Sequence, residues 1–224
     1  MTRTVRVDVA KGRAVAAALL SLALAGPMVG MPMPAAAQDA ASPEAGDPAV
    51  ARIKGFYDVL LSCMKNAKQL GVKGRAEKLA PAVKDTFDMG TMTRLAVGPG
   101  WAKFSPEQQQ AAIDAFTEVT VATYANQFDG YNGETFDVAP APKARGADKI
   151  VETKLTPKDQ PAVPLNYLMR GAGGDARVVD VYLNGTISQL ATRRSEFTSV
   201  VAQSGPDGLA QSLKKQAQQL LSGS

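Results

Sequence analysis

The spacing of apolar side chains changes at Gly130, and this change limits the fold more than any other feature of the chain. Before Gly130, apolar residues recur every three or four positions, which is typical of amphipathic helices. After it, four short segments rich in β-branched and aromatic residues are separated by turn residues, which predicts an antiparallel meander. Helical spacing returns after Gly185. The order of helices, sheet and helices predicts an α+β fold.

Capping residues and helix breakers set the expected element boundaries. Asp47-Pro48 and Ser105-Pro106 each combine a capping side chain with a proline in the first helical turn. Before Gly130 we expect helices over 48–70, 88–97 and 105–127, and a short piece carrying Leu79, Val83 and Phe87. The expected strands are 135–139, 150–155, 163–169 and 177–183, and the final helices run to about residue 203 and over 208–221.

The first 37 residues have the three parts of a secretory signal. Four basic residues precede an alanine- and leucine-rich stretch, and Ala35-Ala36-Ala37 matches a cleavage site. The apolar stretch is short and broken by glycine and proline, which disfavours a membrane span. We therefore expect a signal peptide at 1–37, a flexible leader at 38–47 and a single domain at 48–224. Because the only cysteine, Cys63, lies far from the cleavage point, we expect an unlipidated protein in the periplasm.

Charge and residue counts exclude several classes of function. The whole chain has 25 basic and 21 acidic residues, and without residues 1–37 these counts become 21 and 20. A net charge of +1 does not favour a nucleic-acid partner. Because the chain has no histidine and a single cysteine, it cannot build a Ser-His-Asp or Cys-His centre, and most zinc and copper sites are excluded.

Apolar side chains are more informative than any catalytic motif. The chain has no nucleophile elbow, P-loop or dinucleotide fingerprint. Large aromatic residues gather between 101 and 136, and these residues suit either a plain hydrophobic core or an apolar ligand cavity. Several basic residues are candidate contacts for an anionic group, or else ordinary surface charges: Arg94, Lys143, Arg145, Arg170, Arg193 and Arg194.

The ordered motifs resemble the MlaC / toluene-tolerance auxiliary family of periplasmic lipid-binding proteins, including its hopanoid-associated HpnM branch. The resemblance covers roughly residues 50–221. Its markers are Phe87-Asp88, Met92, Leu95 to Gly98, Trp101, Ser105-Pro106-Glu107-Gln108, Tyr124-Ala125, Phe128, Gly130-Tyr131, Gly133-Glu134, Phe136, Gly185, Ile187-Ser188, Thr192 to Phe197, Asp207-Gly208-Leu209 and Leu213.

This resemblance implies an NTF2/cystatin-like curved sheet of about four strands, with packed helices that enclose an apolar cavity. It implies a lipid carrier and not an enzyme, with bound phospholipid or hopanoid as cargo and no cofactor or metal. The implied partners are an inner-membrane ABC transporter complex with its lipid-binding ring subunit and an outer-membrane lipoprotein complex.

The candidate lipid-binding residues lie on the apolar faces of the expected elements: Met92, Leu95, Trp101, Phe116, Tyr124, Phe128, Leu165, Tyr167, Val179 and Val181. Strand alternation predicts that Val179 and Val181 share a sheet face with Leu183. An NTF2-like isomerase or dehydratase using Asp137 or Asp180 with Tyr167 is an alternative, although alternation favours solvent-facing positions for both aspartates. A structural envelope adaptor is a third hypothesis.

Cleavage at the predicted site gives a defined product. We expect the mature protein in a periplasmic extract to begin near Gln38, because the small residues 35–37 precede it. Intact-mass measurement checks this, and a mass that retains residues 1–37 would contradict it.

Overall fold

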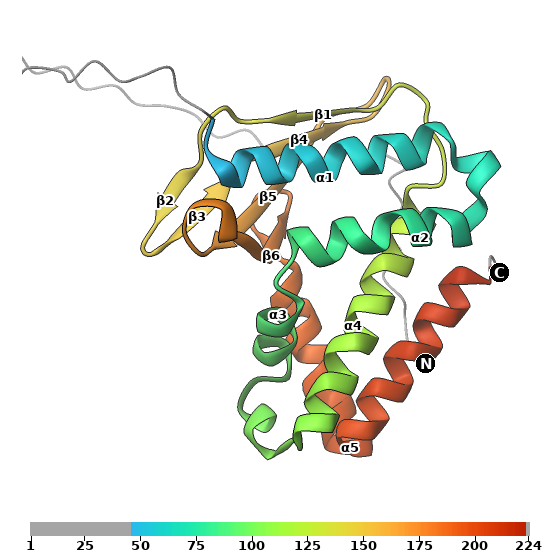
Figure 1. Ribbon diagram of the computed structural model, residues 1–224, viewed down its shortest axis with the longest axis vertical. Coiled ribbons are helices and arrows are strands. Elements are labelled where there is room, and N and C mark those ends of the chain that lie inside the picture. Colours follow the sequence, from blue (N-terminus) through green and yellow to red (C-terminus); the bar gives the residue numbers. More distant parts are fainter. Residues whose placement is uncertain (1–45, 223–224) are drawn as a thin grey trace, which may run out of the picture. The chain divides into compact units, whose positions relative to one another are not determined.

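The computed structural model describes residues 46–222 (Figure 1). The predicted signal peptide at 1–37 and the predicted leader, except for Gly46 and Asp47, lie outside the described residues. Asp47 belongs to the folded part, because its carboxylate accepts a hydrogen bond from the backbone N–H of Ala49 and forms an ion pair with Lys149 at 2.7 Å. Within 46–222, no helix combines the length and the apolar character that crossing a bilayer requires.

The helices before the sheet follow the capping signals closely. They are α1 (Pro48–Lys65), α2 (Ala67–Thr86), α3 (Met89–Val97), a 3-10 turn η1 (Gly98–Lys103) and α4 (Pro106–Gln127). At the start of α4, Ser105 and Gln108 form the reciprocal capping box. The break predicted at Gly71 is a kink inside α2, where Gly71 has φ 62°, and α1 ends earlier, at Lys65.

The sheet contains the four predicted strand segments in meander order. Its strands are β1 (Thr135–Val138), β2 (Lys143–Arg145), β3 (Asp148–Val151), β4 (Thr153–Thr156), β5 (Val163–Arg170), β6 (Arg177–Leu183) and β7 (Ile187–Ser188), and all their pairings are antiparallel. The segment 150–155 is divided at Glu152, because β3 pairs with β2 while β4 pairs with β1. Including the short β2 and β7, the described part of the sheet has seven strands.

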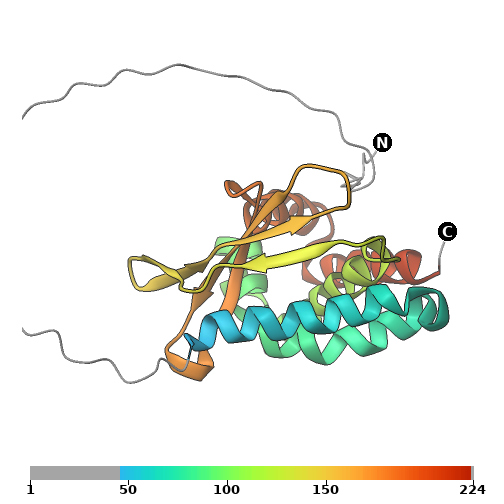
Figure 2. The ribbon, with the colours of Figure 1, turned by 90° about the horizontal axis from the view of Figure 1, so that it is seen from above.

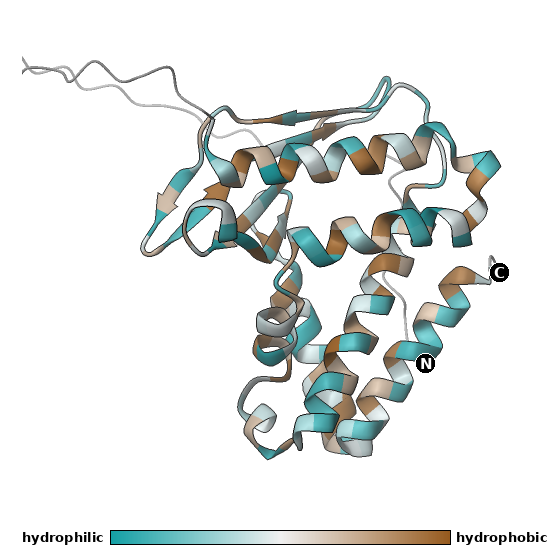
Figure 3. Ribbon diagram, viewed as in Figure 1, coloured by the Kyte–Doolittle hydropathy of each residue, from teal (hydrophilic) through white to brown (hydrophobic). Residues whose placement is uncertain are grey.

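The helices form two groups: α1 lies beside the sheet, whereas α4 and α5 (Gln189–Leu221) pack mainly on each other. Helix α1 lies between the β1–β4 strands and α2 (Figures 1 and 2). Figure 3 shows apolar and polar residues mixed along α1, whose buried positions include Ile53, Phe56 and Leu60. Helix α5 packs on α4, with Phe197 in edge contact with Phe116 at 5.0 Å between ring centroids.

Helix α5 turns back on itself at the predicted break. Gly205 has φ 67° and Pro206 follows it, so the two arms before and after Gly205 correspond to the two predicted helices. This confirms the break, although the helical conformation begins again at Pro206, earlier than the expected residue 208.

A bulge in β6 corrects the predicted alternation. Leu168 pairs with Asp180 and Met169 pairs with Val178, so Val179 has no partner on β5. Val179 is buried but lies outside the main core cluster that contains Val178. The expectation that Val179 and Val181 share one face through simple alternation is therefore wrong.

The two aspartates of the enzyme alternative have different environments. Asp137 is exposed, as alternation predicts, but Asp180 is buried and the solvent-facing prediction for it is wrong. The Asp180 carboxylate accepts hydrogen bonds from the Ser188 hydroxyl at 2.6 Å and the Leu190 backbone N–H at 3.0 Å. Asp180 thus fixes the start of α5 to β6.

Removal of this carboxylate should destabilise the protein. We expect Asp180→Ala to lower the free energy of unfolding by about 1–3 kcal/mol, because buried donors lose their acceptor. The matched change Asp137→Ala, at an exposed position, should alter it by less than about 0.5 kcal/mol. Urea unfolding of both variants measures the difference, and equal effects would contradict the role assigned to Asp180.

Candidate functional site

Seven aromatic side chains meet between α1, the ends of α2 and α4, and the sheet. We call them the aromatic cluster: Phe56, Tyr57, Phe87, Tyr124, Phe128, Phe136 and Tyr167. Tyr57 stacks on Phe136 with 4.4 Å between ring centroids, and Phe56 makes an edge contact with Tyr124 at 5.2 Å. Such pairs add specific geometry to the burial of apolar area.

Strand register explains why these residues meet. Tyr167 on β5 lies opposite Val151 on one side and Val181 on the other, and residues opposite each other share a sheet face. Phe136 reaches the same face through its pairing with Leu155. Helix α1 crosses this face and contributes Tyr57, so segments about a hundred residues apart in sequence form one apolar surface.

A chain of hydroxyl groups lies inside the cluster. The Tyr57 hydroxyl is 2.6 Å from the Thr153 hydroxyl and 3.0 Å from that of Tyr167, and the Thr153 hydroxyl donates to the carbonyl of Leu165. Burial raises the pKa of Tyr57 to about 12 and also raises the pKa values of Tyr124 and Tyr167. These tyrosines are therefore neutral at physiological pH and add no charge to the apolar interior.

One side of the cluster is only half-buried. Tyr167 and Phe87 are almost fully enclosed, whereas other apolar residues pack against the core and keep part of their surface accessible: Tyr124, Phe128, Phe136, Val138, Leu165 and Val181. These residues come from the end of α4 and from the strands, and each keeps some apolar surface accessible.

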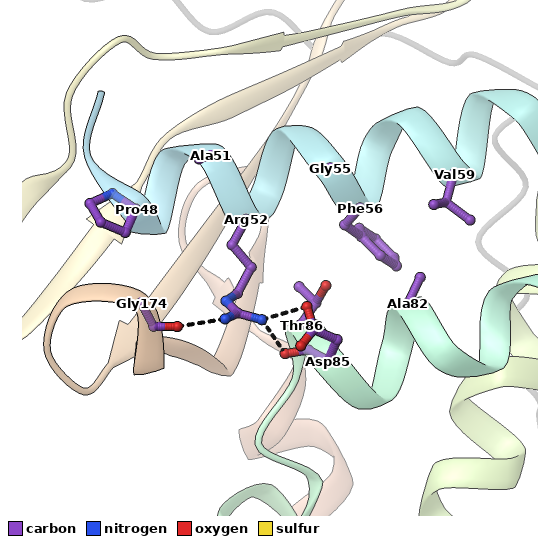
Figure 4. Close-up of a pocket in the computed structure, with 10 residues that line it drawn as sticks. All are labelled: Pro48, Ala51, Arg52, Gly55, Phe56, Val59, Ala82, Asp85, Thr86 and Gly174. Atoms are coloured by element: carbon purple, nitrogen blue, oxygen red, sulfur yellow. Dashed lines mark hydrogen bonds and ion pairs between the residues drawn. The ribbon is translucent and has the colours of Figure 1, made fainter. Parts of the chain in front are cut away.

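A pocket of about 470 Å³ lies between α1 and α2 (Figure 4). Arg52 and Thr86 line it together with apolar residues, among which Phe56 also belongs to the aromatic cluster. If a methylene group occupies about the volume of a water molecule, ~30 Å³, the pocket accommodates roughly 16 methylenes. That is the bulk of one acyl chain and too little for two.

The structure separates the ten predicted lipid-binding residues into groups. Five lie in or beside the aromatic cluster: Tyr124, Phe128, Leu165, Tyr167 and Val181. Four lie on α3, η1 and the first half of α4: Met92, Leu95, Trp101 and Phe116. Val179 occupies the β6 bulge. None of the ten lines the α1–α2 pocket, and their contact with lipid stays a prediction.

Several residues of these sites were not among the predicted ones. Phe56 and Phe87 were assigned to helices without a site role, and Tyr57 was missed. Tyr57 follows Phe56 directly, and two adjacent large apolar residues in a helix indicate an unusually wide buried face. No sequence signal indicates the ion pair between Arg52 and Asp85, because 33 residues separate them.

Metal chemistry has no visible basis in the described part of the chain. Within residues 46–222, no group of three or more histidine, cysteine or acidic side chains could hold a metal ion. Cys63 is buried, and burial raises the pKa of its thiol. A thiol with a raised pKa is a poor nucleophile and a poor metal ligand at neutral pH.

Comparison with known proteins matches the chain to a described protein family. The family model described as MlaC protein matches residues 55–215. Toluene tolerance protein ttg2D of Pseudomonas putida is 29% identical over 106 residues, which are 47% of this chain and 48% of that protein, so the match spans about half the length of the relative.

A solved structure matches over nearly its whole length. It is the phospholipid-binding protein from Ralstonia solanacearum in complex with a phospholipid. The match has 26% identity and a TM-score of 0.64, and it covers 77% of this chain and 98% of that one. The α+β fold predicted from the sequence is confirmed by this match.

Alkaline pH should lower the free energy of unfolding, because the folded protein keeps its buried tyrosines protonated. The pKa of Tyr57 is about 12 against an ordinary value of 10.0, so the unfolded chain loses this proton first. The contribution to stability is complete below pH 10.0 and is lost as the pH rises toward about 12. Urea unfolding at about pH 9 and about pH 11 should show a smaller pH-dependent loss for Tyr57→Phe than for the parent. An equal pH-dependent loss of stability in Tyr57→Phe and the parent would contradict the contribution assigned to the Tyr57 hydroxyl.

Proposed function

Because the chain belongs to the MlaC family, we propose that it binds a phospholipid and carries it through the periplasm between two membranes. The family resemblance read from the sequence is confirmed. The observation that carries the proposal is the similarity to the phospholipid-bound structure, which spans 98% of that protein. The half-buried aromatic and aliphatic residues beside the sheet support it from this chain's own geometry.

The energetics explain why such a carrier is needed. A two-chain lipid exposes about 30 methylenes, and at ~0.8 kcal/mol each their transfer to water costs on the order of 24 kcal/mol. Unassisted diffusion between membranes is therefore negligible. An apolar protein interior gives the chains an environment comparable to a bilayer, so loading is nearly balanced in free energy. Transport then requires no bond to be made or broken.

We place the acyl chains at the half-buried side of the aromatic cluster. Leu165 and Val181 line the sheet there, and Tyr124 and Phe128 come from the end of α4. Their apolar atoms favour methylenes, while the hydroxyls of Tyr57 and Tyr167 in the cluster are already hydrogen-bonded to each other. The headgroup would remain near solvent.

Location and partners follow from the same proposal. The predicted signal peptide at 1–37 supports export to the periplasm, where an inner-membrane ABC transporter complex with its ring subunit and an outer-membrane lipoprotein complex would exchange lipid with the carrier. A hopanoid cargo, as in the HpnM branch, is a second ligand class for the same interior. Asp137 is exposed and Asp180 binds α5, so neither aspartate supports the enzyme alternative.

The direct test is to identify what the purified protein holds. Organic extraction of protein purified without detergent, followed by mass spectrometry, should yield phospholipid in a ratio near one per chain. Hopanoid in its place would assign the cargo to the other class. Repeated absence of any lipid would contradict the carrier and leave the enzyme and adaptor hypotheses.

A bulky substitution beside the cluster should reduce lipid binding selectively. We expect Leu165→Trp to lower bound lipid several-fold with little change in melting temperature, because a half-buried position has room for extra volume. Leu190→Trp, also half-buried but on α5, is the matched control and should keep its lipid. Fully buried Val179 has no such room, so Val179→Trp should cost roughly 1–3 kcal/mol of stability.

Lipid per protein and melting temperature for the three variants measure this. The proposed location is wrong if Leu165→Trp retains its lipid, or if it melts as low as Val179→Trp. Asp137→Asn should leave lipid content unchanged, and loss of the cellular phenotype in an aspartate variant alone would favour the enzyme alternative.

A further inference from the structure

The pocket between α1 and α2 has an apolar wall and a polar corner. Its apolar part is formed by Pro48, Ala51, Phe56, Val59 and Ala82. Between Pro48 and Ala51 on one side and Phe56, Val59 and Ala82 on the other, the guanidinium of Arg52 lies beside Thr86 and Asp85, as Figure 4 shows. An elongated ligand with a charged end would match this arrangement.

The Thr86 hydroxyl is a polar group at the pocket whose hydrogen-bonding capacity the described chain does not use. Thr86 is only 3% exposed and lines the pocket. Among residues 46–222 its side chain makes no hydrogen bond, although buried hydroxyls normally have partners. No fully enclosed polar atom of the described chain is unsatisfied, so this hydroxyl reaches the pocket space. It is a free donor beside a cation.

The Arg52 guanidinium is only partly engaged. Its Nη1 donates to the carbonyl and the carboxylate of Asp85, and its Nη2 donates to the carbonyl of Gly174, each at 2.6 Å. Its Nε–H makes no hydrogen bond within the described residues. The Arg52 side chain is 16% exposed and the Asp85 side chain 67%, so Asp85 can turn into water while Arg52 stays in the pocket. An exposed ion pair of this kind is weak.

Gly55 keeps the space open. It lies inside α1 and lines the pocket, and a Cβ added there would meet nothing within 4 Å. Glycine in a helix interior lowers stability relative to alanine. A larger side chain at this position would therefore favour the helix and fill the pocket.

We propose that the α1–α2 pocket binds a single-chain anionic amphiphile, with its carboxylate or phosphate held by Arg52 and Thr86 and its chain along Phe56, Val59 and Ala82. This site adjoins the aromatic cluster through Phe56, but its ligand is proposed independently of the carrier function. The volume admits about one chain of 16 methylenes. The anion replaces the Asp85 carboxylate on Arg52 and accepts a hydrogen bond from the Thr86 hydroxyl.

Three probes share the same acyl chain and differ in their headgroup. They distinguish recognition of the headgroup charge from binding of the acyl chain. Palmitate carries a carboxylate, 1-palmitoyl lysophosphatidic acid carries a phosphate, and monopalmitin is neutral. Calorimetric titration below the micelle concentration should show both anions binding to the full-length mature protein, and monopalmitin roughly tenfold weaker or more. The tighter anion identifies the headgroup, and either result supports the anionic class. Equal affinity for monopalmitin and palmitate would overturn the proposal.

Two substitutions at the polar corner should act in opposite directions. Thr86→Val removes the free hydroxyl and should weaken palmitate binding several-fold without lowering the melting temperature. Thr117→Val, a buried threonine on α4 outside the pocket, is its matched control. Asp85→Asn removes the competing carboxylate and should strengthen binding. Unchanged palmitate affinity in both Thr86→Val and Asp85→Asn would contradict the placement of the anionic group at Arg52 and Thr86.

A substitution at the apolar wall tests the pocket and separates the two sites. Gly55→Leu should abolish palmitate binding, keep or raise the melting temperature, and leave the phospholipid extracted by organic solvent unchanged. Palmitate binding that survives in Gly55→Leu would overturn the pocket assignment. A parent protein that binds palmitate at this site but yields no phospholipid would contradict the carrier function and leave this proposal standing.

Discussion

The packing of Tyr57 against the sheet is the contact on which both sites depend. Its ring stacks on Phe136, and its hydroxyl is satisfied by Thr153 and Tyr167. This contact fixes one side of α1 on the strands and turns the side that carries Arg52 toward α2. A tyrosine is tolerated in such an apolar interior only because its hydroxyl has partners there, since an unpaired buried hydroxyl costs about 1–3 kcal/mol.

Local sequence determined much of the fold in this chain. The α4 boundaries follow from Ser105 and its capping box, and the turn in α5 follows from Gly205 and Pro206. The bulge at Val179 could not be predicted, because an inserted residue in a strand changes pairing but leaves composition unchanged. The buried role of Asp180 was missed for the same reason, since its partners are determined by how β6 meets α5.

The site was predicted less completely than the fold because one helix can serve two interfaces. Helix α4 buries residues on several sides, among them Phe116 against α5 and Ala125 beside α2. A sequence pattern shows that such a residue is apolar and does not show which neighbour it contacts. Tyr124 and Phe116 therefore looked equivalent, yet only Tyr124 lies in the aromatic cluster. The polar corner at Arg52 and Thr86 depends on long-range contacts and left no local pattern.

Phe56 is a shared wall, since its ring lines the α1–α2 pocket and also contacts Phe87 and Tyr124 in the aromatic cluster. A movement of this ring that enlarges the space on one side reduces the space on the other. Occupancy on one side that shifts this ring changes the free energy of occupancy on the other side, and thermodynamic reciprocity makes the two effects equal. A single phenylalanine thus borders both proposed sites, and ligands that both displaced its ring would be coupled through it.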